Sequence, residues 1–144
     1  MILVVDDEEA SRELLGRIVT RAGYEAVQAA DGFEALSLLE RSKIELVISD
    51  ILMPRMNGYA LVARLRAKWP NMPVILTTGF LSQEAAKNMM NGSVDFIPKP
   101  IDPQTLITMI NGHVPVSSQF QPPQLRSIDA LYFSSPQIGE MKKL

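Results

Sequence analysis

The chain has 144 residues, of which 47% are hydrophobic, and a formal net charge of −2, values that suit one globular domain with a single core. It contains no cysteine, which excludes disulfides, thiolate metal sites and cysteine catalysis. The charge gives no general attraction to nucleic acid or to an anionic membrane, so neither is an expected partner. No apolar run approaches ~18 residues and no signal peptide is visible before the first strand, so we expect a cytoplasmic protein.

Short apolar runs alternate with amphipathic segments through most of the chain. The runs predict strands over 2–5, 26–30, 44–49, 73–77 and 94–98. The segments between them predict helices over 9–22, 33–41, 58–69 and 82–91, and a last helix that starts after Asp102-Pro103 and ends near Gly112. This alternation is typical of an α/β fold. We expect a doubly wound (βα)5 three-layer sandwich around a parallel five-stranded sheet.

The first helix carries its apolar residues at helical spacing. Ala10, Leu14, Ile18 and Ala22 form one stripe, with Leu15 and Val19 beside it, and Gly23 is a suitable stop residue.

Polar side chains that could do chemistry follow several of the predicted strands. Asp6 and Asp7 follow the first strand, Asp50 the third, Thr78 the fourth and Lys99 the fifth. The carboxyl ends of parallel strands line up along one edge of a sheet, so these side chains should converge there. Three carboxylates repel one another unless a cation lies among them, and oxygen ligands without histidine or cysteine favour a hard ion such as Mg²⁺. The layout indicates an ion-assisted phosphoryl site.

Residues 1 to about 113 resemble the receiver domain of two-component response regulators. The matching pieces, in order, are the Asp6-Asp7 pair, Asp50 followed by Met53-Pro54 and Gly58, Thr78-Gly79, and Phe96 three residues before Lys99-Pro100. The resemblance implies a flavodoxin-like strand order of 2-1-3-4-5. It also implies a phosphorylatable switch in a phosphorelay, not an enzyme, with chemistry limited to self-phosphorylation and slow autodephosphorylation.

The expected phosphoacceptor is Asp50, because a carboxylate can attack phosphorus when its charge and that of the incoming phosphate are neutralised. By resemblance, Mg²⁺ is bound by Asp7, by Asp50 and by the backbone carbonyl of Leu52, while Asp6 acts through a bound water. The phosphodonor would be a histidine kinase or a phosphotransfer protein.

Lys99 supplies a positive charge that could pair with Asp50 at rest and with a phosphoryl oxygen afterwards; the Lys-Pro bond that follows it is typically cis in receivers. The hydroxyl of Thr78 could donate to the phosphoryl group, with Thr77 as the rival candidate, and family spacing selects Thr78. Phe96 stands where receivers carry a switch aromatic, although a plain core phenylalanine explains it equally well. Gly58 suits a left-handed or tight backbone.

Two alternative functions are weighed against the receiver. A phosphatase of the haloacid-dehalogenase type also forms an aspartyl phosphate with Mg²⁺, but its nucleophile ends the first strand and a second Asp follows two positions later. A degenerate receiver used as a scaffold would have lost an acidic residue or the lysine, and here none is lost. The chain could also be a receiver fragment of a larger regulator or of a hybrid kinase.

Residues 114–144 form a tail rich in proline, serine and glutamine, a composition that favours an extended or mobile segment. Apolar residues within it also allow a short amphipathic helix that docks on a partner or on the domain. A downstream protein would meet the face formed by the helix over 82–91, the strand over 94–98 and the last helix. A homodimer is a further possible assembly. His113, the only histidine, is expected to be a helix-end residue and not a ligand or a base.

Overall fold

The structure is a computed structural model, and it describes residues 1–79 and 94–115. Its strands are β1 (Ile2–Val5), β2 (Ala26–Ala29), β3 (Leu46–Asp50), β4 (Val74–Thr78) and β5 (Val94–Pro98). Its helices are α1 (Glu9–Arg21), α2 (Gly32–Arg41), α3 (Gly58–Lys68) and α5 (Pro103–His113). The predicted helix over 82–91, and the tail from residue 116 onward, lie outside the described residues.

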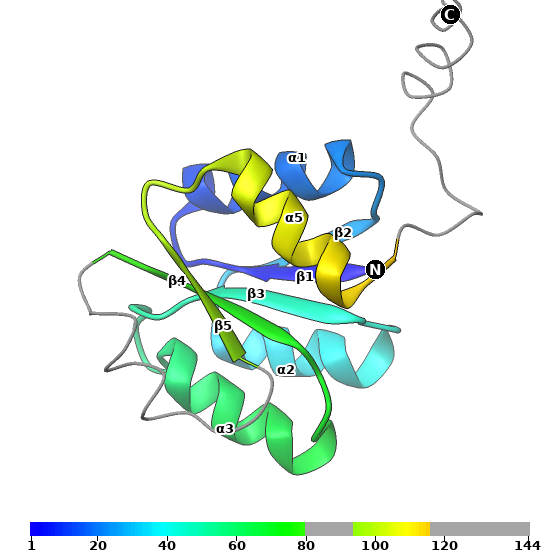
Figure 1. The fold of residues 1–144 in the computed structure, drawn as a ribbon. Helices are drawn as coiled ribbons and strands as arrows, with labels where there is room; N and C mark the ends of the chain where they lie inside the picture. Colours follow the sequence, from blue (N-terminus) through cyan, green and yellow to red (C-terminus); the bar gives the residue numbers. More distant parts are fainter. Residues whose placement is uncertain (80–93, 116–144) are drawn as a thin grey trace, which may run out of the picture.

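All the strands pair in parallel, in the order β2-β1-β3-β4-β5, as predicted. Helices α1 and α5 lie on one side of the sheet, and α2 and α3 lie on the other (Figure 1). β2 and β5 are the edge strands, whereas β1 and β3 lie inside the sheet. This arrangement confirms the predicted three-layer α/β sandwich.

Each face of the sheet has its own apolar core, because successive side chains of a strand point to opposite faces. The core on the side of α2 and α3 includes Leu3, Val5, Val47, Val74, Leu76 and Phe96 from the strands. The core on the side of α1 and α5 includes Ile2, Val4, Leu46, Ile48, Ile75 and Ile97. The inner strands β1, β3 and β4 are therefore buried on both sides, which accounts for their continuous apolar runs in the sequence.

Side chains at the helix ends supply hydrogen bonds that the backbone lacks there. Asp31, Asn57 and Asp102 each accept a hydrogen bond from the backbone N–H three residues later, at 2.8, 2.8 and 2.9 Å. Gly23, just past the end of α1, has φ 102°, a left-handed conformation that glycine adopts without a Cβ clash.

Among the helices of the described part, none is long and apolar enough to cross a bilayer.

The packing stripe predicted for α1 is partly wrong. Leu14 is 51% exposed, and the helix instead packs Leu15, Ile18 and Val19 against the sheet. Leu14 and Leu15 lie about 100° apart around the helix axis, so only one of them can face the core. The stripe that starts at Leu15 buries the larger apolar set, which decides the rotation of the helix.

Candidate functional site

The carboxyl edge of the sheet gathers three carboxylates from two adjacent strands. Val5 of β1 is paired with Ser49 of β3, so the next residues, Asp6 just after β1 and Asp50 at the end of β3, lie side by side. Asp6, Asp7 and Asp50 each place a carboxylate oxygen within 4.8 Å of the others. The register of two parallel strands therefore builds the cluster.

Two of these carboxylates are buried, Asp6 at 1% and Asp50 at 8% exposure, whereas Asp7 is exposed. Oδ1 of Asp6 accepts a hydrogen bond from the Glu8 amide at 3.0 Å, while its buried Oδ2 has no partner within the described residues. Burial raises the pKa of the Asp6 carboxyl above its usual 3.8, and the charges of Asp50 and Asp7 raise it further. The Glu8 amide and Lys99 oppose that rise.

Lys99, which directly follows the edge strand β5, brings a positive charge to the cluster. Its Nζ lies 3.1 Å from Oδ2 of Asp50. Its backbone N–H donates to the carbonyl of Thr78 at 2.8 Å, which fixes the chain at the end of β5 beside β4. The Lys99-Pro100 peptide bond is cis, as the resemblance implied.

The loop from Ile51 to Asn57, between β3 and α3, lies directly after Asp50. The amide of Leu52 points to Oδ1 of Asp50 at 3.4 Å, and the Leu52 side chain is 62% exposed. The amide of Gly58 donates to the carbonyl of Ile51 at 2.8 Å, which closes the loop. Gly58 has no positive φ, so its role is close approach and not a left-handed turn.

The left-handed residue of this loop is Arg55, with φ 69°. The sequence analysis did not identify it, because non-glycine residues with long side chains rarely adopt this conformation. The one local signal is Pro54, a residue that often starts a turn.

Both threonines at the end of β4 are buried, Thr77 at 0% and Thr78 at 6% exposure. Thr77 lies opposite Asp50 in the strand register, and its Oγ1 is buried without a hydrogen-bond partner in the described part of the chain. Thr78 is the last residue of β4 and lies opposite Pro98. The two side chains point to opposite faces of the sheet, so at most one of them faces the same side as Asp50.

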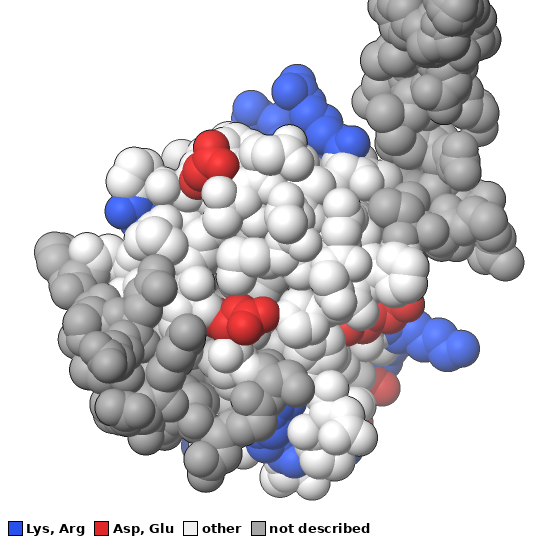
Figure 2. Space-filling view, viewed as in Figure 1, with Lys and Arg blue, Asp and Glu red and all other residues white. Residues whose placement is uncertain are grey.

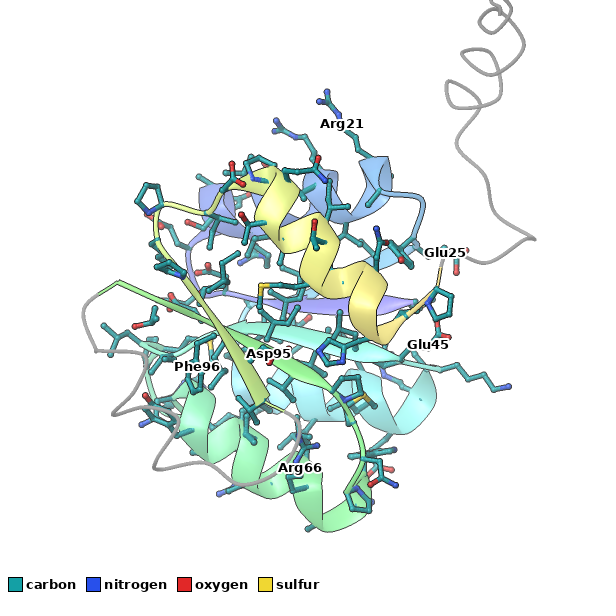
Figure 3. The ribbon with its side chains drawn as sticks, viewed as in Figure 1. Arg21, Glu25, Glu45, Arg66, Asp95 and Phe96 are labelled. Atoms are coloured by element: carbon teal, nitrogen blue, oxygen red, sulfur yellow. The ribbon has the colours of Figure 1, made fainter. Side chains whose placement is uncertain are left out.

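Phe96 and His113 lie away from the carboxylate cluster. Phe96 is 7% exposed and packs in the core on the side of α2 and α3. Its neighbour Asp95 faces the opposite side of β5, where its Oδ2 lies 2.6 Å from Nε2 of His113 at the end of α5 (Figure 3). Within the described residues, His113 therefore lies at a helix end, within hydrogen-bond distance of Asp95, and takes no part in the cluster.

The donor set of the cluster fits a hard divalent cation. It consists of carboxylate oxygens alone, and the unpartnered Oδ2 of Asp6 is a buried acceptor that an ion or its bound water would satisfy. Asp6, Asp7 and Asp50 are thus the residues of the described part that could hold a metal.

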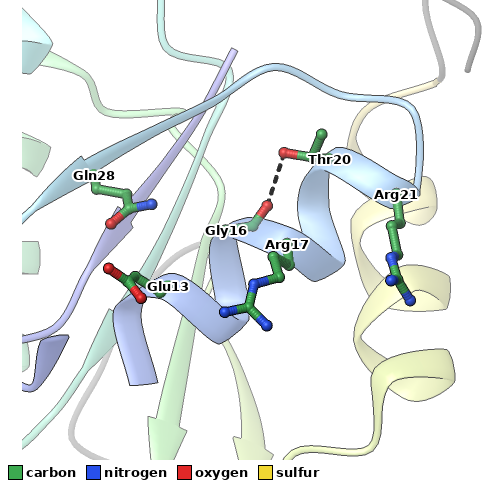
Figure 4. Close-up of a pocket in the computed structure, with 6 residues that line it drawn as sticks. All are labelled: Glu13, Gly16, Arg17, Thr20, Arg21 and Gln28. Atoms are coloured by element: carbon green, nitrogen blue, oxygen red, sulfur yellow. Dashed lines mark hydrogen bonds between the residues drawn. The ribbon is translucent and has the colours of Figure 1, made fainter. Parts of the chain in front are cut away.

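A second concavity lies on the flank of α1 that faces β2. It is an open groove of about 400 Å³, lined by Glu13, Gly16, Arg17, Thr20, Arg21 and Gln28 (Figure 4). None of these residues belongs to the carboxylate cluster. On the molecular face seen in Figure 2, charged side chains of both signs lie among uncharged ones.

Comparison with known proteins gives one consistent family. The family model described as "Response regulator receiver domain" matches residues 2–111. The response regulator protein FleR of Pseudomonas aeruginosa is 34% identical over 113 residues, which are 78% of this chain and 24% of FleR. An uncharacterized 14.6 kDa protein of Leptolyngbya boryana is 38% identical over 112 residues, which are 76% of this chain and 86% of that protein.

Solved structures agree with these sequence matches. A response regulator receiver domain protein from Clostridium thermocellum superposes with a TM-score of 0.72 and 29% identity, over 78% of this chain and 91% of that one. The chain therefore covers nearly all of a solved receiver domain, while it spans about a quarter of the length of FleR.

Proposed function

Because this chain belongs to the response regulator receiver family, we propose that it accepts a phosphoryl group on Asp50 from a histidine kinase or a phosphotransfer protein, in the presence of Mg²⁺. The observation that carries the proposal is the meeting of three carboxylates within 4.8 Å, one of which has the Lys99 ammonium 3.1 Å away. The family is one of signalling switches in two-component systems. The phosphatase alternative is not favoured by the family match.

The proposed step is a displacement at phosphorus. A carboxylate oxygen of Asp50 forms the new P–O bond while the bond between phosphorus and the donor's leaving group breaks, and the leaving group takes the electron pair. Lys99 balances the negative charge on Asp50 before the transfer and on a phosphoryl oxygen after it. The spacing of the family motif assigns Thr78 as the hydroxyl donor to a second phosphoryl oxygen, whereas Thr77 is the residue that lies opposite Asp50 in the strand register.

Mg²⁺, when bound, neutralises the charges of the attacking carboxylate and of the phosphoryl group. Asp7, Asp50 and the backbone carbonyl of Leu52 would hold the ion, and Asp6 would act through a bound water. The burial of Asp6 supports this role, and so does its Oδ2, which has no hydrogen-bond partner within the described residues. A buried carboxylate oxygen near two other carboxylates is stable only with a cation nearby.

The test is to incubate the full chain with a small-molecule phosphodonor and Mg²⁺, and to measure intact mass. One acid-labile phosphoryl group should be added to the wild-type chain and none to Asp50→Asn. Asp95→Asn is the matched control, because Asp95 lies on β5 beside His113 and away from the cluster, and it should be labelled as the wild type is. Undiminished labelling of Asp50→Asn would refute the proposal.

We further propose that residues 1–113 act as the receiver and 114–144 as an appended tail. Phosphorylation would bias Thr78 and Phe96 between two arrangements and so change the face that includes β5 and α5, where a downstream protein would bind. Amide exchange in β5 and α5 should therefore change on phosphorylation of the wild-type chain. Identical exchange in both forms would remove these two elements from the output face.

A further inference from the structure

The loop that follows Asp50 is tied to the start of α2 by an ion pair. Nη2 of Arg55 lies 2.7 Å from Oδ2 of Asp31. The other oxygen of Asp31, Oδ1, accepts from the Glu34 amide at 2.8 Å and caps α2. One carboxylate thus fixes both the first turn of a helix and the middle of the loop.

Arg55 needs such contacts because its backbone is unfavourable. Its φ of 69° lies in the left-handed region, and the Met56 amide donates to the Pro54 carbonyl at 2.7 Å, across Arg55. A three-residue turn with a left-handed central residue is the rarer and more strained of the two γ-turn types. Strained backbone near a functional site persists only when surrounding contacts hold it.

Two further contacts hold the same loop against the start of α2. The Arg55 guanidinium lies over the Phe33 ring, 5.7 Å from its centroid, and Arg64 of α3 lies 5.8 Å from the same centroid. The Met56 side chain lies against Gly32, so closely that a Cβ at Gly32 would stand 2.5 Å from the Met56 Sδ. The loop is thus attached at two successive residues to the first two residues of α2.

The same loop carries Leu52, whose carbonyl is a proposed Mg²⁺ ligand, three residues before Arg55. The hydrogen bond from the Gly58 amide to the Ile51 carbonyl joins the two ends of the loop. The position of the Leu52 carbonyl therefore depends on the contacts that hold the segment between Ile51 and Gly58. The Asp31–Arg55 pair is the charged contact within that segment.

We infer that Asp31 and Arg55 are positioning residues for the metal site, and that their ion pair keeps the loop in the conformation that binds Mg²⁺. The inference rests on the proposed function, because it assumes that the loop supplies a ligand. When only a fraction of the protein molecules has the loop conformation that binds Mg²⁺, the apparent Mg²⁺ affinity is reduced by that fraction. Loss of the pair lowers the competent fraction and so weakens Mg²⁺ binding, without removing any metal ligand.

The experiment measures Mg²⁺ affinity of the full chain by calorimetric titration for Asp31→Asn, Arg55→Gly and the double variant. Asparagine caps a helix as well as aspartate does, so Asp31→Asn removes the charge and keeps the cap. Glycine adopts positive φ freely, so Arg55→Gly removes the side chain and relieves the backbone strain. Arg17→Ala is the control, since Arg17 is an exposed arginine on α1.

We expect Asp31→Asn to weaken Mg²⁺ binding roughly threefold, as loss of an exposed ion pair would, and Arg55→Gly to weaken it less, because glycine also relieves the strained backbone that the pair holds. In the Arg55→Gly background, Asp31→Asn should have no further effect, because the pair is already broken. Without Mg²⁺, amide exchange at Met56 should accelerate in Asp31→Asn while exchange at Glu34 stays slow. Arg17→Ala should bind Mg²⁺ as the wild type does.

Unchanged Mg²⁺ affinity in both single variants, or additive losses in the double variant, would overturn the inference while wild-type labelling on Asp50 stands. A wild-type chain that binds no Mg²⁺ would instead overturn the proposed function.

Discussion

Gly58 lies so close to Asp50 that a side chain there would collide with the backbone of the proposed phosphoacceptor. A Cβ at Gly58 would stand 2.6 Å from the Asp50 carbonyl oxygen and 2.9 Å from the Cα of Ile51. Backbone atoms cannot move aside as the end of a flexible side chain can. The start of α3 and the end of β3 are therefore joined by a contact that only glycine permits.

Gly58→Ala should destabilise the domain by about 2 kcal/mol, within the usual range for overpacking a buried site. Urea unfolding followed by circular dichroism measures the change. Gly112→Ala is the matched control, because a Cβ at that position in α5 would meet nothing within 4 Å. It should be neutral or stabilising, since alanine favours a helix. Equal stability of Gly58→Ala and wild type would contradict the prediction, because it would show that the backbone shifts to make room for the methyl group without cost.

Removal of one buried charge from the carboxylate cluster should stabilise the metal-free chain. At neutral pH, Asp6→Asn relieves like-charge repulsion around a nearly inaccessible side chain, and we expect Tm to rise by about 4 °C, equivalent to roughly 1 kcal/mol. Mg²⁺ should raise Tm of the wild type, since it binds the folded chain, and should raise that of Asp6→Asn less. Differential scanning calorimetry with and without millimolar Mg²⁺ measures both; a fall in Tm of the metal-free variant would contradict the repulsion.

The cap of α5 should make stability depend on pH in the acid range. Hydrogen bonds from the side chain and the amide of Thr105 hold the pKa of Asp102 below its ordinary 3.8. A carboxyl with a lowered folded-state pKa contributes stability above its unfolded value, and this contribution is lost as the pH falls through the folded value. The wild type should therefore lose stability relative to Asp102→Asn as the pH falls from about 5 through 3.8 and below. Urea unfolding at several pH values measures the difference, and a constant difference would argue against it.

Tyr24 should be important for the end of α5. It is 5% exposed, and its hydroxyl lies within hydrogen-bond reach of the Val114 carbonyl and of Oδ1 of Asn111, the latter at 2.6 Å. Tyr24→Phe should cost about 1 kcal/mol and speed amide exchange at Val114, whose N–H donates to Ile110. Exchange at Leu106, a buried residue in the first turn of the same helix, is the internal reference. Unaltered exchange at Val114 would mean that the hydroxyl does not hold this end.

The features that the sequence predicted correctly have local causes. Apolar runs predicted the strands, and Asp102 before Pro103 predicted the start of α5, because strand burial and helix capping depend on neighbouring residues. The meeting of the site residues was predicted from the strand ends, whereas the strand order and the individual roles of these residues came from the resemblance, since pairing order is not encoded in periodicity.

What the sequence did not predict depends on contacts between distant residues. The left-handed backbone of Arg55 is accompanied by an ion pair with Asp31, which is 24 positions earlier in the chain, and the one local signal for it is Pro54. The rotation of α1 was misjudged at Leu14 for a related reason, since two apolar stripes overlap and the sheet selects between them. The buried hydroxyl of Thr77 became visible only when the register placed it opposite Asp50.

The Lys99 ammonium and the carboxylates of the cluster differ in how easily local unfolding would remove them from the site. Asp6 and Asp50 are carried by strands inside the sheet, whereas Lys99 follows β5, which has a single strand neighbour. Partial unfolding of folded proteins starts in segments with few partners, and an edge strand with its following helix is such a segment. Detachment of β5 and α5 would leave the carboxylates in place without their lysine. The domain could then pass through an open state that still binds a divalent ion but has lost the positive charge that steadies a phosphoryl group.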